Sequence, residues 1–147
     1  MMSKLGTYQA LNRLLTILYR SLPMYLTYAH PWTHRGDEKA LATLRHIADE
    51  QQQMAARIAQ HILDHHGPIE TGEYPIDFLD MHDLSIDFLI TRLVQFQKND
   101  VAAIEQCVSQ LKADRQSAAL AEEALGASRA QLETLEELAE QFSKSVS

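Results

Sequence analysis

Turn-forming residues are scarce in this chain of 147 residues, which contains only five glycines and four prolines. So few turn formers exclude a many-stranded β-sandwich, which needs a turn after every short strand. A disordered chain is excluded as well, because 46% of the residues are hydrophobic and only 22% are charged. The composition therefore predicts one helical domain over residues 1–147.

Cysteine is almost absent, since Cys107 is the only one. A lone thiol cannot form an internal disulfide, and zinc sites built on Cys-x-x-Cys pairs are excluded. Cys107 lies among regularly spaced apolar residues, so we expect a buried, unreactive thiol rather than a catalytic nucleophile. A Gly-rich phosphate-binding loop is excluded too, because the glycines are scattered.

Basic residues are in deficit, with 13 Lys and Arg against 20 Asp and Glu and a formal charge of -7. Binding to nucleic acid usually needs a basic surplus, so we do not expect such a partner. The most apolar stretch, residues 14–29, contains Arg20 and Pro23 and is shorter than a membrane span. Arg20 would also interrupt the apolar region of a signal peptide. The sequence therefore predicts a cytoplasmic protein that does not insert into membranes.

Apolar side chains recur at steps of three and four residues along four segments, which places them on one face of an α-helix. The predicted helices run over residues 8–29 with a kink at Pro23, from Asp37 to Gly67, from near Asp83 to Leu111, and from Asp114 to Phe142. Each helix has one apolar stripe. Four such helices bury their stripes by packing together as a bundle.

The lengths of the connections predict the topology. Residues 31–36 and 112–114 are short connections, so the first and second helices, and the third and fourth, should form antiparallel hairpins. Residues 68–82 form a longer connection, which at about 3.3 Å per residue can reach about 50 Å, the length of a long helix. An all-α four-helix bundle with this long crossover between helices two and three has ferritin-like topology.

Short runs in three of the predicted helices resemble a known family. The runs are Leu11-Asn12-Arg13-Leu14-Leu15-Thr16 followed by Tyr25, Ile58-Ala59-Gln60-His61-Ile62-Leu63 before Gly67, and Leu132-Glu133-Thr134. Over nearly the whole chain they are similar to the bacterioferritin and rubrerythrin branch of the ferritin-like superfamily. The resemblance implies a homodimer formed through the first two helices, which carry spare apolar side chains at Tyr19, Met24 and Tyr28.

That family binds two metal ions through a Glu from each of two helices and a Glu-x-x-His pair from each of the other two. The positions that resemble these ligands hold residues that cannot replace them, namely Leu18, Gln51, Met54, Leu89, Leu125 and Ser128. We therefore expect no di-iron centre and no cofactor. The four apolar residues of this set should fill the former metal cavity, and Gln51 and Ser128 should form a small polar network with Tyr25.

A displaced metal site is the alternative. His61 and His65 stand four residues apart on the predicted second helix and could chelate iron or another divalent ion, and His46 and Glu50 form a second such pair. The face around Glu50 is polar throughout, which predicts contact with water. The resemblance places Gln52 where the family has its haem methionine, so no haem is predicted.

Two functions remain open from the sequence. The first is a non-enzymatic bundle that lacks a di-iron centre and serves as a structural or protein-interaction module. The second is a metal-binding or iron-stress protein that uses a site built from His46, Glu50, His61 or His65. A small apolar ligand inside the bundle is a third possibility, provided that the apolar side chains leave a cavity.

Overall fold

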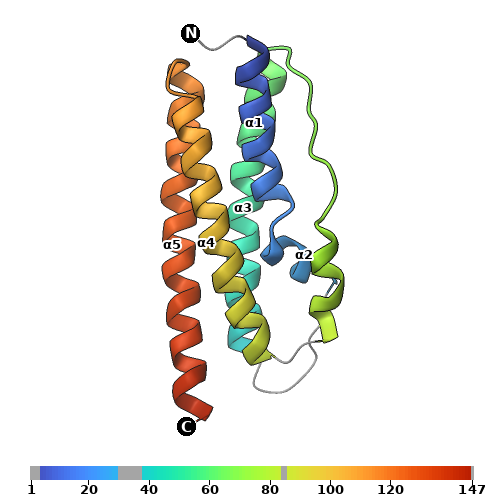
Figure 1. The fold of residues 1–147 in the computed structure, drawn as a ribbon, viewed down its shortest axis with the longest axis vertical. Helices are drawn as coiled ribbons and strands as arrows, with labels where there is room; N and C mark the ends of the chain where they lie inside the picture. The colour runs from blue at the N-terminus through green and yellow to red at the C-terminus, as the bar shows by residue number, and fades with distance from the viewer. Residues whose placement is uncertain (1–3, 30–37, 84–85, 147) are drawn as a thin grey trace.

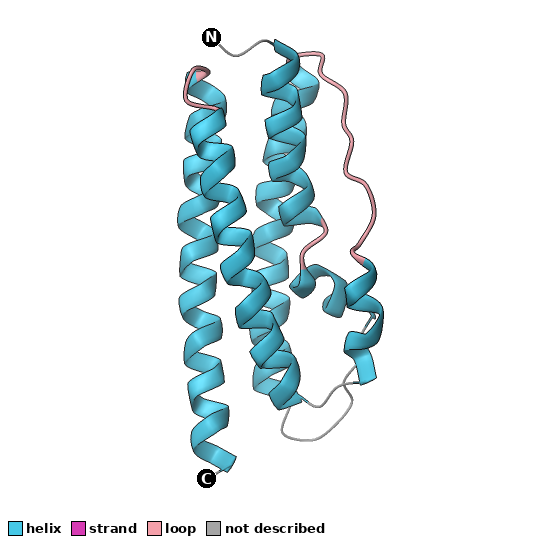
Figure 2. Ribbon diagram, in the orientation of Figure 1, coloured by secondary structure: helices cyan, strands magenta, loops and turns pink. Residues whose placement is uncertain are grey.

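The computed structural model describes residues 4–29, 38–83 and 86–146, and within these ranges the chain forms helices and no strand (Figure 2). The elements are α1 (Lys4–Tyr19), α2 (Leu22–Ala29), α3 (Glu38–Asp64), the 3-10 helix η1 (Ile76–Asp83), α4 (Ile86–Gln110) and α5 (Arg115–Val146). None of the helices in these ranges has the length and the apolar character that a membrane crossing requires. The prediction of an all-helical chain is confirmed.

The long helices lie side by side along one axis (Figure 1). α1 and α3 run in opposite directions, as do α4 and α5, whereas α3 and α4 run in the same direction. The chain between α3 and η1 returns along α1, so the predicted long crossover is present, and η1 adds a short helix to it. α2 packs against α3 and η1 beside the lower half of the molecule.

The predicted first helix is in fact two helices. α1 ends at Tyr19, and α2 begins at Leu22, after two intervening residues, at a steep angle to it (Figure 1). Pro23 is the second residue of α2, where the N–H that proline lacks would have no partner within the helix. Ser21 caps α2, because its Oγ accepts a hydrogen bond from the Met24 N–H at 3.2 Å. The proline therefore starts a new helix instead of bending the old one.

The end of α3 agrees with the predicted stop at Gly67. The Gly67 N–H donates to the Ile62 carbonyl at 2.9 Å, and His66 takes the left-handed φ of 60° that turns the chain. A Cβ atom at Gly67 would lie 2.6 Å from the Tyr8 ring, so close approach of α1 requires the glycine. The Tyr8 hydroxyl donates to the His65 carbonyl, which ties α1 to this turn.

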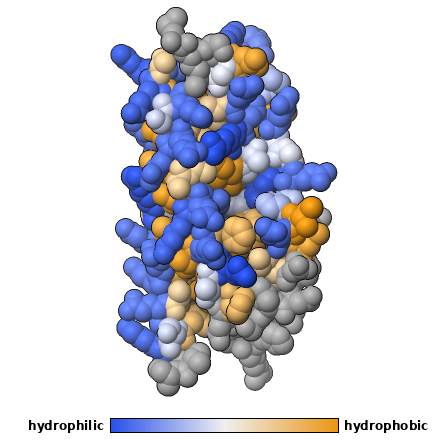
Figure 3. All heavy atoms as spheres, in the orientation of Figure 1, coloured by the Kyte–Doolittle hydropathy of each residue, from blue (hydrophilic) through white to orange (hydrophobic). Residues whose placement is uncertain are grey.

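Two apolar clusters form most of the core. The first joins α1, α3, α4 and α5 and contains Leu18, Met54 and Leu125. The second joins α2, α3, η1, α4 and α5 and contains Leu89. These are the four apolar residues that were expected to fill the interior, and each of them is less than 10% exposed. Figure 3 shows that the surface is largely polar on the face it draws, with hydrophobic side chains gathered on the side of η1.

The buried face of α5 differs from the predicted apolar stripe. The apolar spacing over residues 114–142 passes through Ala118 and Leu132, which predicts that both are buried, but both are only partly buried. Ser117 and Gln131, one residue earlier in each case, are at most 4% exposed. The buried face of α5 follows the helical period and includes polar residues as well as apolar ones. A prediction that picks apolar residues therefore misses buried polar positions such as Ser117 and Gln131.

Candidate functional site

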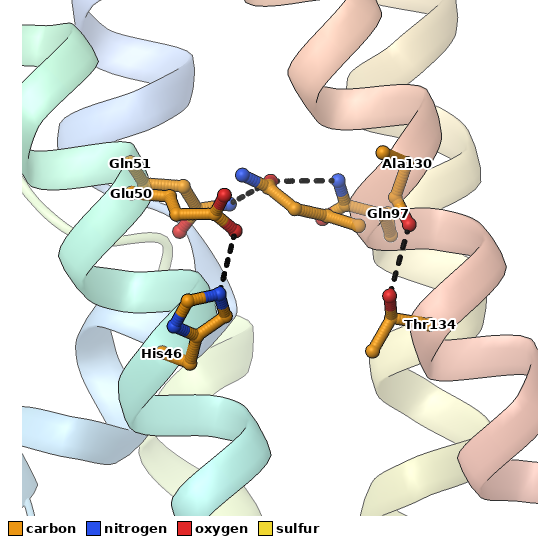
Figure 4. Close-up of polar contacts among 7 residues, drawn as sticks. His46, Glu50, Gln51, Gln97, Ala130 and Thr134 are labelled. Atoms are coloured by element: carbon orange, nitrogen blue, oxygen red, sulfur yellow. Dashed lines mark hydrogen bonds and ion pairs between the residues drawn. The ribbon is translucent and has the colours of Figure 1, made fainter.

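Three glutamine side chains from three helices meet in the interior: Gln51 of α3, Gln97 of α4 and Gln131 of α5. Gln51 and Gln97 reach towards each other from opposite sides of the bundle (Figure 4). All three side chains are at most 4% exposed. A buried amide must find hydrogen-bond partners inside the protein, and here each glutamine bonds to another member of the group.

The bonds connect four parts of the chain. Gln51 Nε2 donates to Gln131 Oε1 at 3.3 Å, and Gln97 Nε2 lies 3.5 Å from the same oxygen. Gln97 Nε2 also donates to the Ser128 backbone carbonyl at 3.0 Å. At the junction of α1 and α2, Ser21 Oγ donates to Gln51 Oε1 at 2.6 Å. We call these five residues the amide layer.

The amide layer separates the two apolar clusters. On α3, Gln51 lies between Ile47 of the second cluster and Met54 of the first. On α4, Gln97 lies between Leu93 and Val101, which belong to the second and first clusters respectively. Ser21 lies between Leu18 of the first cluster and Leu22 of the second, and Gln131 lies between residues of the two clusters on α5. A polar layer between apolar ones fixes how far each helix can slide along its neighbours.

One atom of the layer has spare bonding capacity. Gln97 Oε1 is buried and accepts no hydrogen bond within the described part of the chain. The layer is otherwise neutral, and an amide oxygen is a weaker metal ligand than a carboxylate or an imidazole. The chemistry of this donor set therefore suits hydrogen bonding between helices and does not suit tight binding of iron.

Sequence reasoning found part of this layer. Gln51 and Ser128 both belong to the layer, although they do not bond to each other: Gln51 bonds to Ser21 and Gln131, and the Ser128 backbone carbonyl accepts from Gln97. The Tyr25 ring lies in an aromatic group, 5.2 Å from the Tyr74 ring and 5.6 Å from the Phe78 ring. The sequence assigned no role to three members, Ser21, Gln97 and Gln131. Gln97 could have been found, because it lies four residues after Leu93 and four before Val101, on the same face of the helix as these apolar residues.

His46 and Glu50 lie on the outer face of α3 (Figure 4). His46 Nε2 is 3.7 Å from Glu50 Oε1, and the two side chains are 75% and 46% exposed. The prediction that this polar face meets water is confirmed. Six glutamates of α5 are also exposed to water, namely Glu122, Glu123, Glu133, Glu136, Glu137 and Glu140. One of them, Glu123, forms a two-pronged ion pair with Arg57 of α3 that lowers the pKa of the carboxyl group.

His61 and His65 form a separate group at the far end of α3. Their rings lie 4.4 Å apart, and His61 Nε2 is 3.0 Å from Ser117 Oγ. Ser117 Oγ donates to Asp114 Oδ2 at 2.8 Å, so this hydroxyl is held by the cap of α5. Burial and the neighbouring His65 lower the pKa of His61.

The His46–Glu50 pair and the His61–His65 pair cannot bind the same ion. His46 and His61 are fifteen residues apart on one helix, which corresponds to about 22 Å. Within the described ranges, no group of three or more His, Cys, Asp or Glu side chains has an arrangement that could hold a metal ion. The four candidate residues His46, Glu50, His61 and His65 therefore do not converge on one centre.

A cleft of about 490 Å³ opens between α1, α4 and the connection that precedes η1. We call it the side cleft. Its apolar walls include Ile17, Phe78 and Phe96, and Asp100 of α4 also lines it. Asp100 is partly buried, and loss of hydration raises the pKa of its carboxyl group to about 7. No pattern in the sequence indicated this cleft, because one wall of it comes from the long connection.

The cysteine agrees with its prediction. Cys107 lies on the buried face of α4 and its side chain is fully shielded from solvent. Burial raises the pKa of the thiol, which keeps it in the unreactive protonated form at neutral pH.

Comparisons with known proteins find no match to any family model, to any curated protein or to any solved structure. The resemblance to the ferritin-like superfamily therefore stands only on the short runs of residues quoted above. The function is inferred from the geometry of the chain itself.

Proposed function

We propose that this chain is a non-enzymatic four-helix bundle of ferritin-like topology that serves as a structural or protein-interaction module in the cytoplasm. In this view α1 and α2 together form the first arm of the bundle. The long crossover and the parallel direction of α3 and α4 support that topology. The observation that carries the proposal is the amide layer, which lies where a ferritin-like bundle would hold its metal ions.

The amide layer supports a scaffold rather than a redox centre. Gln51 and Gln131 bond to each other, so an iron ion would have to break that contact and then face neutral oxygens. The same bonds hold the α1–α2 junction, α3, α4 and α5 at one level. A bundle with a fixed register presents a defined outer surface, which is what an interaction module needs.

Metal content tests this proposal. Tag-free protein would be expressed with added iron, stripped of loosely bound ions with a chelator and measured by mass spectrometry for metal per chain. We expect fewer than about 0.1 ions per chain, because a site of only two protein ligands, such as His46 with Glu50 or His61 with His65, holds metal weakly. One or two tightly held ions per chain would contradict the proposal and favour the metal-binding alternative.

We also propose that two copies associate through α1 and α2. The exposed Tyr19 ring and Met24 line a groove of about 760 Å³ beside α3, together with Tyr74. The side chain of Tyr28, the third residue of the predicted dimer surface, lies outside the described residues. Light scattering at micromolar concentrations should give twice the chain mass, and Tyr19→Glu should shift the equilibrium towards monomer. A monomeric wild type at 100 µM would contradict the dimer.

A further inference from the structure

We propose that the side cleft binds a small organic ammonium ion, with the Asp100 carboxylate as its counter-ion and the rings of Phe78 and Phe96 as its wall. The inference goes beyond the scaffold function and does not depend on it. The side cleft and the amide layer share Ser21, but none of the three glutamines of the layer lines the cleft.

Asp100 is a charged group in need of a partner. It follows Phe96 by one helical turn on α4, so both side chains are on the face that lines the side cleft. Its carboxylate has no hydrogen bond or ion pair with any residue in the described ranges. Loss of hydration raises its pKa, and within the described ranges no cation lies close enough to offset that burial. A bound cation would supply that missing charge.

The two arginines of the side cleft are committed to other contacts. Arg13 Nη2 donates to Gln106 Oε1 at 2.9 Å. Arg20 Nε donates to the Gly72 carbonyl at 3.1 Å, and its guanidinium lies 5.0 Å from the centroid of the Tyr74 ring. Arg13 therefore links α1 to α4, and Arg20 links the end of α1 to the connection. Each guanidinium thus has at least one N–H engaged by the protein, which leaves it less free to bind a carboxylate or phosphate ligand.

The charge balance of the side cleft also favours a cation. Three carboxylates line it, from Glu70, Glu73 and Asp100, against the two guanidinium groups of Arg13 and Arg20. The two glutamates are exposed and lie on the connection at the rim. With Asp100 ionised the cleft carries a net charge of about -1, which favours a cation, and Asp100 provides the contact inside.

The walls indicate an organic cation rather than a metal ion. The rings of Phe78 and Phe96 meet edge to face with centroids 5.3 Å apart, and Ile17 and Pro75 continue the apolar surface. Aromatic faces attract ammonium groups and also bury the carbon chain attached to them. A metal ion would need several oxygen or nitrogen ligands at one point, and Asp100 offers one carboxylate. The volume of about 490 Å³ is within the range of small-molecule sites.

The test compares three probes that differ only in the charged end. They are 2-phenylethylammonium, the neutral 2-phenylethanol and the anion phenylacetate, each titrated to 10 mM into isotopically labelled protein at pH 8. We expect the ammonium probe to shift the amide signals of Ile17, Phe96 and Asp100, and to bind at least tenfold more tightly than either other probe. Equal binding of the alcohol, tighter binding of phenylacetate or no shift at 10 mM would overturn the proposal.

Two matched variants locate the site. Asp100→Asn should weaken binding of the ammonium probe at least tenfold. Glu122→Gln removes the same charge from an exposed position of α5, away from the side cleft, and should leave binding within twofold. Unchanged binding in the Asp100 variant, or an equal loss in both variants, would overturn the assignment. Circular dichroism would verify that both variants are folded.

The pH dependence gives a second readout. The charged groups that line the side cleft with Asp100 are Arg13 of α1, Arg20 directly after α1, and Glu70 and Glu73 of the connection. Because only the ionised Asp100 pairs with a cation, affinity for the ammonium probe should rise about tenfold from pH 5.5 to pH 8. The Asp100→Asn variant should lose that rise. A rise of the same size in the variant would assign it to the other four groups and overturn the role of Asp100.

Discussion

The amide layer and the side cleft are both polar regions within a largely apolar molecule, and they differ in how their polar groups are paired. Gln51, Gln97 and Gln131 are neutral, and each is bonded to another member of its layer. Asp100 carries a charge at high pH and has no partner in the described ranges. A neutral network in which every amide makes at least one hydrogen bond stabilises one arrangement of the helices, even with Gln97 Oε1 left without a partner in the described ranges. An unpaired charge costs stability and remains open to a ligand. The difference separates a structural element from a candidate binding site.

Placing a charge in the amide layer should have the largest effect. Gln51→Glu replaces the amide that donates to Gln131 Oε1 with an oxygen, so two acceptors face each other in a buried place. We expect the free energy of unfolding at pH 8 to fall by about 3–5 kcal/mol, as measured by urea unfolding. Protonation restores a donor and the folded state then binds the extra proton, so part of the loss should be recovered at pH 5.

Gln53→Glu is the matched control for that variant, since Gln53 is exposed and lies on the same helix. Its free energy of unfolding should stay within about 0.5 kcal/mol of the wild type. A Gln51→Glu variant as stable as this control at pH 8 would show that water reaches the layer. The layer would then not differ from the side cleft in how its polar groups are shielded.

Removing the charge from the side cleft should have a smaller effect of opposite sign. The pKa of Asp100 is raised in the folded state, from 3.8 to about 7, so between these values the folded chain binds the proton and the unfolded chain does not. The contribution of Asp100 to stability should therefore fall as pH rises from 4 to 7 and stay level above that. Asp100→Asn removes this loss and should raise the free energy of unfolding at pH 8 by about 1–3 kcal/mol.

Urea unfolding at pH 4.5 and pH 8 measures this effect, with Glu122→Gln as the control for the loss of one exposed charge. The gain from Asp100→Asn should be present at pH 8 and small at pH 4.5. An equal gain at both pH values would mean that the substitution acts through packing or helix propensity, and the account of an unpaired carboxylate would be wrong.

Removing the hydroxyl at the edge of the amide layer should have the smallest effect. Ser21→Ala takes away the donor to Gln51 Oε1 and the cap of α2 together, and should cost about 1–2 kcal/mol of unfolding free energy. Ser128→Ala is the control, because Gln97 bonds to the backbone carbonyl at that position, and should cost less than about 0.5 kcal/mol. If the two variants were equally stable in urea, Ser21 would not belong to the layer.

The helices could be predicted from the sequence because apolar spacing reports directly on which face is buried. The same spacing hid Gln97 and Gln131, since a stripe selected for apolar residues passes over a polar residue at a core position. Pro23 was read as a kink, but Ser21 offers a cap two residues before it, so a new helix can begin there. The side cleft could not be predicted, because its outer wall is the connection before η1, and periodicity does not place an irregular segment.

The central claim is that the middle of the bundle is a closed neutral layer that takes no cation. Nuclear magnetic resonance of the side-chain amides with a substoichiometric amount of Mn²⁺ tests it most directly, because this paramagnetic ion broadens signals near its binding place. We predict that the Gln51, Gln97 and Gln131 amide signals keep their linewidths while exposed groups such as His46 and Glu50 broaden first. Selective broadening of the three buried amides would contradict the claim and place a metal site at the centre of the bundle.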